Sequence, residues 1–214
     1  EIGPAYALRA ALRDMAGRVD EMKRDQALAL EQAARIDDRS TMADVALARA
    51  SYALDTGEFD EVIVQAREAL RLSDERTGHV QVTRARMSLG AALAMSGQTE
   101  EGIAVLEQVR SEAIARGVRH LEVTVSLTIG RMRVQTGSAR QALPLLESGL
   151  ALARQLRLPD RELHGVLNLG EAHLALGELD LAQVQIELAV TMAQEQGHSQ
   201  LEPVLAEALA EIAR

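Results

Sequence analysis

Five histidines are the side chains of this sequence that come closest to catalytic chemistry, because histidine is the usual general base and a common metal ligand. Three of them follow a glycine within three residues, at His79, His120 and His198. An internal repeat explains that recurrence, so we expect these three to pack at helix ends. His164 and His173 are nine residues apart, which is too far for the i, i+4 pair of a helical metal site.

Sequence motifs of enzymes are absent from the chain. It has no phosphate loop ending in Gly-Lys-Ser/Thr, no nucleophile elbow and no His-Glu-x-x-His. The lack of cysteine excludes disulfides, thiol catalysis and cysteine-bound zinc. Acidic pairs have simpler explanations: Glu100-Glu101 suits a helix start, where carboxylates complement the dipole, and Asp37-Asp38 suits a solvated loop. The sequence therefore predicts a protein that is not an enzyme and uses no metal or cofactor.

Composition indicates which elements carry these side chains. The 214 residues are 47% hydrophobic but only 1% aromatic, and alanine and leucine recur throughout, which favours helices over strands. A net charge of −9 without a basic run argues against direct nucleic-acid binding. No apolar stretch approaches the ~18 residues of a membrane span, so we expect no membrane partner and a cytoplasmic location. Because the chain opens with Glu1, we expect it to be a segment of a longer protein.

A 40-residue repeat runs through the chain. Five glycines keep this spacing: Gly17, Gly57, Gly97, Gly137 and Gly177. Seven residues before each stands a small residue: Ala10, Ala50, Gly90, Gly130 or Gly170. Nine residues after the last three stand Leu106, Leu146 and Ile186, with Gln26 and Ala66 as weaker matches. Apolar residues around these columns follow helical spacing, so each repeat is predicted to be a hairpin of two amphipathic helices.

Further helix breakers separate one hairpin from the next. Gly78, Gly117 and Gly197 suit left-handed helix caps, and Pro159 suits a helix start. Pro144 falls inside an expected helix and predicts a kink. The predicted helices span 5–15, 19–36, 42–55, 59–76, 80–95, 99–116, 121–135, 139–157, 161–175, 179–196 and 200–213.

The repeat resembles the tetratricopeptide repeat (TPR). The pattern is clearest as Leu169-Gly170, then Gly177-Glu178-Leu179-Asp180, Ala182 and Ala189. In its 40-residue length and in the segment 150–154, the repeat resembles a longer bacterial variant of the TPR. That variant is typical of sensor regions in signal-transduction regulators of the maltose-activator type. Arg9 and Arg49 stand where later repeats have Leu89, Ile129 and Leu169. HEAT or armadillo repeats are the alternative, because they share the ~40-residue length.

The resemblance implies an all-α, right-handed α-solenoid that forms a single domain. It would contain five TPR-like hairpins, at about 1–38, 39–78, 79–118, 119–158 and 159–198, and a capping helix at 199–214.

One stripe of each first helix is the candidate binding surface. Positions 13, 9, 6 and 2 before the turn glycine share a face, and in TPR arrays the first helices line a concave groove. Arg84 and Arg131 would supply positive charge there, and hydroxyls and amides would bind a peptide backbone or a carboxylate. The predicted site residues are Arg84, Ser88, Thr124, Thr128, Arg131, Gln135, His164, Asn168 and Glu171.

The expected function is that of a non-catalytic scaffold. Its partner would be a protein or peptide segment held in the concave groove, and the chain would be the sensor or interaction region of a bacterial signalling or transcription regulator. The alternative is a structural module that self-associates into a homodimer. An enzyme is a third hypothesis, for which the sequence shows no nucleophile or metal constellation.

Overall fold

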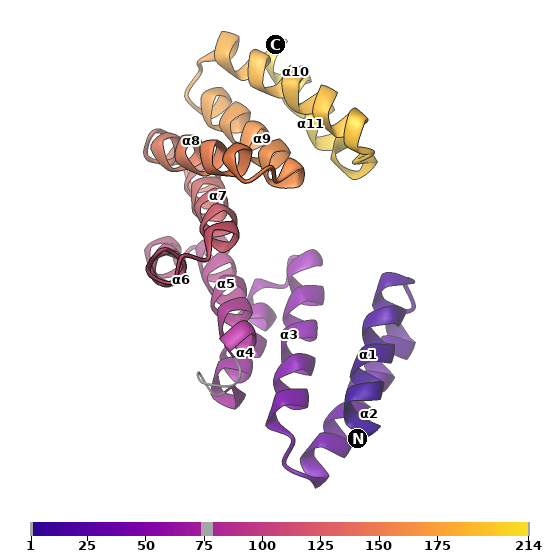
Figure 1. The fold of residues 1–214 in the computed structure, drawn as a ribbon. Helices are drawn as coiled ribbons and strands as arrows, with labels where there is room; N and C mark the ends of the chain where they lie inside the picture. The colour runs from indigo at the N-terminus through magenta and orange to yellow at the C-terminus, as the bar shows by residue number, and fades with distance from the viewer. Residues whose placement is uncertain (1, 74–78, 214) are drawn as a thin grey trace. The chain divides into compact units, whose positions relative to one another are not determined.

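The structure is a computed structural model that describes residues 2–73 and 79–213. Within these ranges the chain is 86% helix with no strand, and its eleven α-helices pack as consecutive pairs (Figure 1). The helices are α1 (Ile2–Met15), α2 (Val19–Arg35), α3 (Arg39–Asp55), α4 (Phe59–Leu72), α5 (His79–Met95), α6 (Thr99–Ala115), α7 (Arg119–Gln135), α8 (Ala139–Gln155), α9 (Pro159–Ala175), α10 (Leu179–Gln196) and α11 (Glu202–Ile212).

The predicted helix boundaries differ from these by a few residues at most, for reasons visible in the caps. Helix α3 begins three residues earlier than expected because Asp38 caps it, accepting hydrogen bonds from the backbone N–H of Thr41 at 3.1 Å and from its hydroxyl at 2.5 Å. The expectation that Asp37-Asp38 is only a solvated loop is therefore wrong for Asp38. The last predicted helix is divided into a 3₁₀ turn, η1 (Ser199–Leu201), and α11, which has Pro203 in its first turn.

The repeat glycines occupy the turns, as predicted. All five have positive φ, from 68° at Gly17 to 93° at Gly97, and so do the junction glycines Gly117 and Gly197. Gly78 and the expected helical residues 74–76 lie outside the described residues. Helix α8 continues through Pro144, and the predicted kink there stays a prediction.

The described chain forms two compact units, Glu1–Val105 and Leu106–Arg214, and each is treated by itself. The division falls inside α6. Within the first unit each helix packs on the next, and the first helices of neighbouring hairpins also touch, α1 on α3 and α3 on α5. Its core is rich in alanine, with larger side chains such as Val62, Leu89 and Leu93 between them.

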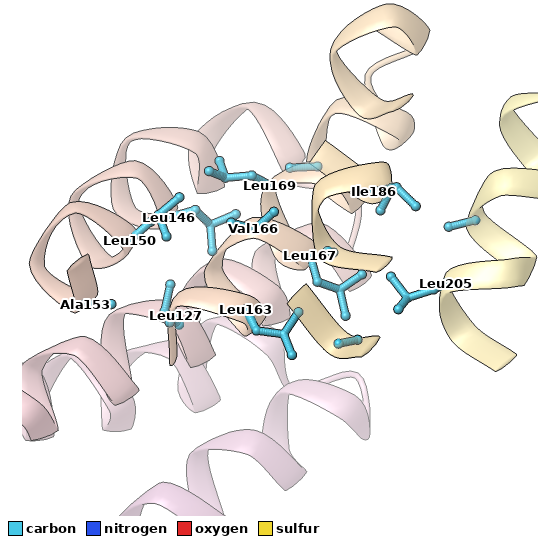
Figure 2. Packing of buried hydrophobic residues seen from close by; sticks show 14 of the residues in the cluster. Leu127, Leu146, Leu150, Ala153, Leu163, Val166, Leu167, Leu169, Ile186 and Leu205 are labelled. Atoms are coloured by element: carbon cyan, nitrogen blue, oxygen red, sulfur yellow. The ribbon is translucent and has the colours of Figure 1, made fainter. Parts of the chain in front are cut away.

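The second unit has a larger aliphatic core. Helices α7 and α9 lie side by side, α8 packs on both of them, and α10 packs on α9. Figure 2 shows Leu146, Val166 and Leu169 meeting between α8 and α9, all of them buried. Leu205 of α11 extends toward Leu167 of α9 in the same view, so the last helix covers the open end of this core.

The small-residue column marks the closest approach of helices within a hairpin. A Cβ atom on Gly170 would lie 2.5 Å from Cδ1 of Ile186, a residue of the column nine after the turn glycine. In the third hairpin, a Cβ on Gly102 of α6 would collide with the backbone carbonyl oxygen of Gly90, a member of this column. The repeated small residues are therefore required by packing between the two helices of a hairpin.

A buried carboxylate that pairs with two arginines holds the first hairpin together. Asp25 is only 1% exposed, and Arg9 donates to both of its carboxylate oxygens at 2.6 Å, while Arg13 donates to Oδ2 at 2.6 Å. Arg9 stands where later repeats have buried leucine or isoleucine, so this pair replaces an apolar contact. The hydrogen bonds from Arg9 lower the pKa of Asp25 despite the opposing effect of burial.

Candidate functional site

A hollow of about 450 Å³ lies on the second unit, where α7 and α9 run side by side. Helix α7 contributes Thr124, Leu127, Thr128, Arg131 and Gln135. Helix α9 contributes Arg161, His164, Leu167, Asn168 and Glu171. The remaining wall comes from the C-terminal segment, through Leu201 of η1 and Val204 of α11. A volume of this size falls within the range of ~300–1,000 Å³ that is usual for ligand sites.

Seven of the nine predicted site residues meet in this hollow, four from α7 and three from α9. They come together because the same stripe positions recur in neighbouring hairpins whose first helices pack side by side. Arg84 and Ser88 lie on α5 in the first unit, where Arg84 is exposed and Ser88 is half-buried. That any of the nine binds a ligand stays a prediction, as does a patch combining Arg84 with Arg131.

Two cations and one carboxylate line the hollow. Arg131 and Glu171 attract each other, yet none of the ion pairs within 4.0 Å among the described residues includes either of them, or Arg161. Desolvation by the surrounding protein is the main influence on both groups: it lowers the pKa of Arg131 and raises that of Glu171, and their mutual attraction opposes each shift. The attraction between the two groups therefore offsets only part of the cost of desolvating each charge.

The hydroxyl groups of the hollow are oriented as acceptors. Thr128 Oγ1 donates to the backbone carbonyl of Thr124 at 2.8 Å, and Thr124 Oγ1 donates to that of His120 at 3.1 Å. Because each hydroxyl proton is used within α7, the oxygen lone pairs are left to accept a hydrogen bond from a ligand. The ring of His164 behaves similarly, since Nδ1 lies 2.6 Å from the carbonyl oxygen of Asp160 and so acts as the donor there. In the neutral ring, Nε2 is then the acceptor.

A buried amide and two leucines form the base of the hollow. Asn168 is only 4% exposed, and its Nδ2 donates to the backbone carbonyl of Leu127 at 3.4 Å, which links α9 to α7. Leu127 and Leu167, both buried, occupy equivalent positions, ten residues before their turn glycines. The site thus has an apolar base, and its wall carries neutral polar groups, two cations and one carboxylate beside the apolar Leu201 and Val204.

The sequence prediction missed Arg161 and the apolar residues of the hollow. Arg161 lies 16 residues before Gly177, one helical turn beyond the last stripe position considered, so extending the stripe would have included it. An equivalent residue in the first unit, Gln81, donates from Nε2 to Asp44 Oδ1 at 3.0 Å. Leu201 and Val204 could not be found from the stripe, because they reach the hollow only through the packing of the C-terminal segment.

Two of the histidines lie beside carboxylates. His198 Nε2 lies 3.1 Å from Asp160 Oδ1, and His173 Nδ1 lies 2.7 Å from Glu178 Oε2, in both cases at the end of a helix. In the part of the chain that the structure describes, no three histidine, aspartate or glutamate side chains are grouped so as to hold a metal ion. No helix among residues 2–73 and 79–213 is long and apolar enough to cross a membrane.

Comparison with known proteins gives no family assignment. No protein-family model matches the chain, and no curated protein is significantly similar to it. The likeness to TPR proteins therefore rests on the residues of the repeat and on the helical hairpins alone.

Proposed function

We propose that this chain is a non-catalytic binding scaffold whose second unit holds an extended peptide segment with an acidic group. The observation that carries the proposal is the hollow on α7 and α9, which brings together seven polar residues of one repeat stripe. On this proposal the hairpins are TPR-like and form a right-handed α-solenoid with a capping helix. The stripe then lies on the concave face, where repeat proteins of this kind bind their partners.

A peptide backbone suits the hydrogen-bonding groups of the hollow. The peptide's backbone N–H groups can donate to the hydroxyl oxygens of Thr124 and Thr128 and to His164 Nε2. Each of these side chains already donates its own proton to a backbone carbonyl of its helix, so these atoms are left as acceptors. The Gln135 amide can both donate and accept. The leucines at the base offer an apolar contact for one side chain of the peptide. A sugar would be a poorer ligand, since none of the residues that line the hollow is aromatic.

Charge selects an acidic ligand. Arg131 and Arg161 outnumber Glu171 in the hollow, although the chain as a whole carries a net charge of −9. A guanidinium binds a carboxylate through two parallel hydrogen bonds, which gives both affinity and direction. We therefore assign the acidic group of the ligand, either a side-chain carboxylate or a peptide C-terminus, to these arginines.

The resemblance to bacterial regulators gives the biological setting of the proposal. A peptide-binding array of this type would serve as the sensor or interaction region of a signalling or transcription regulator. Binding would be read out through other parts of such a protein.

Selection of peptides from a random library on the whole chain tests the proposal. We expect enrichment of segments that carry aspartate, glutamate or a free C-terminal carboxylate, and isothermal titration of the best peptide should give saturable binding. Amidating the C-terminus or changing the acidic residue to its amide then identifies which carboxylate is bound. Selection without acidic enrichment would contradict the charge argument, and binding that Arg131 and Arg161 do not influence would place the ligand elsewhere.

Self-association is a second candidate because α1 carries an exposed apolar stripe. The side chains of Leu8, Leu12 and Met15 are 66%, 59% and 87% exposed. Their spacing of four and three residues places them on one face of α1, and α1 also packs against α2 and α3. Contact between the α1 stripes of two copies would bury these side chains. Light scattering should then show a dimer that Leu8→Glu with Leu12→Glu converts to a monomer. A monomer at all concentrations would exclude this function.

A further inference from the structure

Two positions that are apolar in later hairpins become polar where the first hairpin meets the second. Gln26 stands nine residues after its turn glycine, where later hairpins have the fully buried Leu106, Leu146 and Ile186. Arg49 stands eight residues before the next turn glycine, where Leu89, Ile129 and Leu169 are buried. Gln26 is only 3% exposed, and Arg49 Nε donates to its Oε1 at 3.3 Å.

The first hairpin shows how an arginine at this repeat position can be paired with a carboxylate of the same protein. Arg9 occupies the same repeat position as Arg49, but it makes two 2.6 Å hydrogen bonds with the buried carboxylate of Asp25. Among the described residues, no carboxylate forms such a pair with Arg49, and the hydrogen bond from its Nε to Gln26 is long. The two terminal nitrogens of Arg49 remain as donors, and a half-buried guanidinium that lacks an anionic partner is costly.

These two residues line a cavity of about 330 Å³ between α2, α3 and the start of α4. Met22, Tyr52 and Ala53 give it an apolar side, and Lys23, Glu58 and Glu61 add charges to that of Arg49. The lining therefore has two cations and two carboxylates around an apolar patch, with no net charge. This cavity lies in the first unit and shares no residue with the hollow on α7 and α9.

The four charges are not paired with one another. Among residues 2–73 and 79–213, no ion pair within 4.0 Å includes any of them. Lys23 Nζ lies 5.6 Å from the centre of the Tyr52 ring, Glu58 Oε1 accepts from Thr56 Oγ1 at 3.1 Å, and Glu61 Oε1 accepts from Gln65 Nε2 at 2.9 Å. Opposite charges thus face one cavity with space left between them.

We propose that this cavity binds a small zwitterion with an aliphatic body, of the class of the free aliphatic α-amino acids. The ligand carboxylate accepts from the terminal nitrogens of Arg49, and its ammonium group lies near Glu58 and Glu61. The aliphatic side chain packs on Met22 and Ala53. The cavity volume is at the small end of the range for ligand sites, which suits a ligand of this size.

Titration of the whole chain with L-leucine, followed by calorimetry and by thermal unfolding, tests the proposal. We expect saturable binding and a raised melting temperature at about 10 mM ligand, ten times a dissociation constant of ~1 mM. N-acetyl-L-leucine lacks the cation and L-leucinamide lacks the anion, so each should bind at least about tenfold more weakly. The absence of heat and of a melting shift with leucine and with its aliphatic homologues would overturn the proposal, as would equal binding of all three compounds.

Substitutions of the residues that line the cavity test whether leucine binds there. Arg49→Gln should weaken leucine binding at least about tenfold, and Glu61→Gln should weaken it as well, because each removes one charge that the ligand needs. Arg24→Gln and Glu31→Gln are matched controls, exposed on α2 and outside the cavity lining, and should leave binding unchanged. Circular dichroism and melting of the ligand-free variants identify any that do not fold. If Glu61→Gln folds and binds leucine as the parent does, or if the controls lose binding equally, the cavity is not the site.

Discussion

A Cβ atom added to Gly130 would lie 2.5 Å from Cγ of Leu146, because α7 and α8 are in close contact at this point of the hairpin. Leu146 is fully buried and cannot move into open space. Gly130→Ala should therefore destabilise the protein by about 1–3 kcal/mol, despite the better helix propensity of alanine. Urea unfolding measures the loss. An unchanged or increased stability would show that the two helices are not in close contact here.

Leu146→Ala removes the side chain that Gly130 accommodates. We expect a cost of ~2–5 kcal/mol, as for other deletions in a packed core. Combining Leu146→Ala with Gly130→Ala should cost less than the sum of the two single changes, since the added methyl group then occupies space that the leucine has left. Strict additivity in urea unfolding would refute direct contact between the two positions.

The pH dependence of stability should reveal the buried carboxylate of Asp25. Its pKa is lowered in the folded protein by Arg9 and Arg13, so it stabilises the fold above the ordinary value of about 3.9 and loses this contribution as the pH falls through the lowered pKa. Asp25→Asn should lower the melting temperature at neutral pH and flatten its decline below about pH 4. Asp14→Asn, in the same hairpin, is the control. A parallel decline in the parent and in Asp25→Asn would contradict this assignment.

Protonation of Glu171 should strengthen the binding of an acidic peptide. Burial raises the pKa of Glu171, so the folded state favours the protonated carboxyl group. The protonated group contributes to the stability of the fold at low pH, and this contribution is lost as the pH rises through the raised pKa. Below that pKa the hollow keeps its arginine charges without the carboxylate. Affinity should thus increase as the pH falls from neutral through the raised pKa of Glu171, while the peptide carboxylates, with ordinary pKa values, stay ionised. Glu171→Gln should bind more tightly at neutral pH and should lose this pH dependence, and a variant that keeps the pH dependence of the parent would contradict the prediction.

The repeat made most of the fold predictable from the sequence. Five glycines in one phase defined the turns, and the small and apolar columns beside them defined which helix faces pack together. The cap at Asp38 was missed because it depends on a side-chain hydrogen bond to Thr41 and not on periodicity. The 3₁₀ turn before α11 was missed because the apolar pattern does not distinguish it from a continuous helix.

The candidate site was predictable only where it repeats. Thr128 and Asn168 are equivalent positions of neighbouring hairpins, so the same stripe contains both of them. Arg49 and Gln26 were visible as departures from the repeat, but their meeting beside a cavity depends on how α2 packs against α3. A single sequence does not show which of the charged residues that depart from the repeat have a partner of opposite charge in the folded protein, as Arg9 has in Asp25.

The most direct test of the central claim is calorimetric titration of the best selected acidic peptide into three forms of the whole chain. These are the parent, Arg131→Gln with Arg161→Gln in the hollow, and Arg116→Gln with Arg140→Gln, two exposed arginines of the same unit outside it. We predict equal melting temperatures, at least a tenfold loss of affinity, or ~1.4 kcal/mol, for the hollow pair, and no loss for the other pair. If the hollow pair binds like the parent while the other pair loses affinity, the peptide does not bind between α7 and α9.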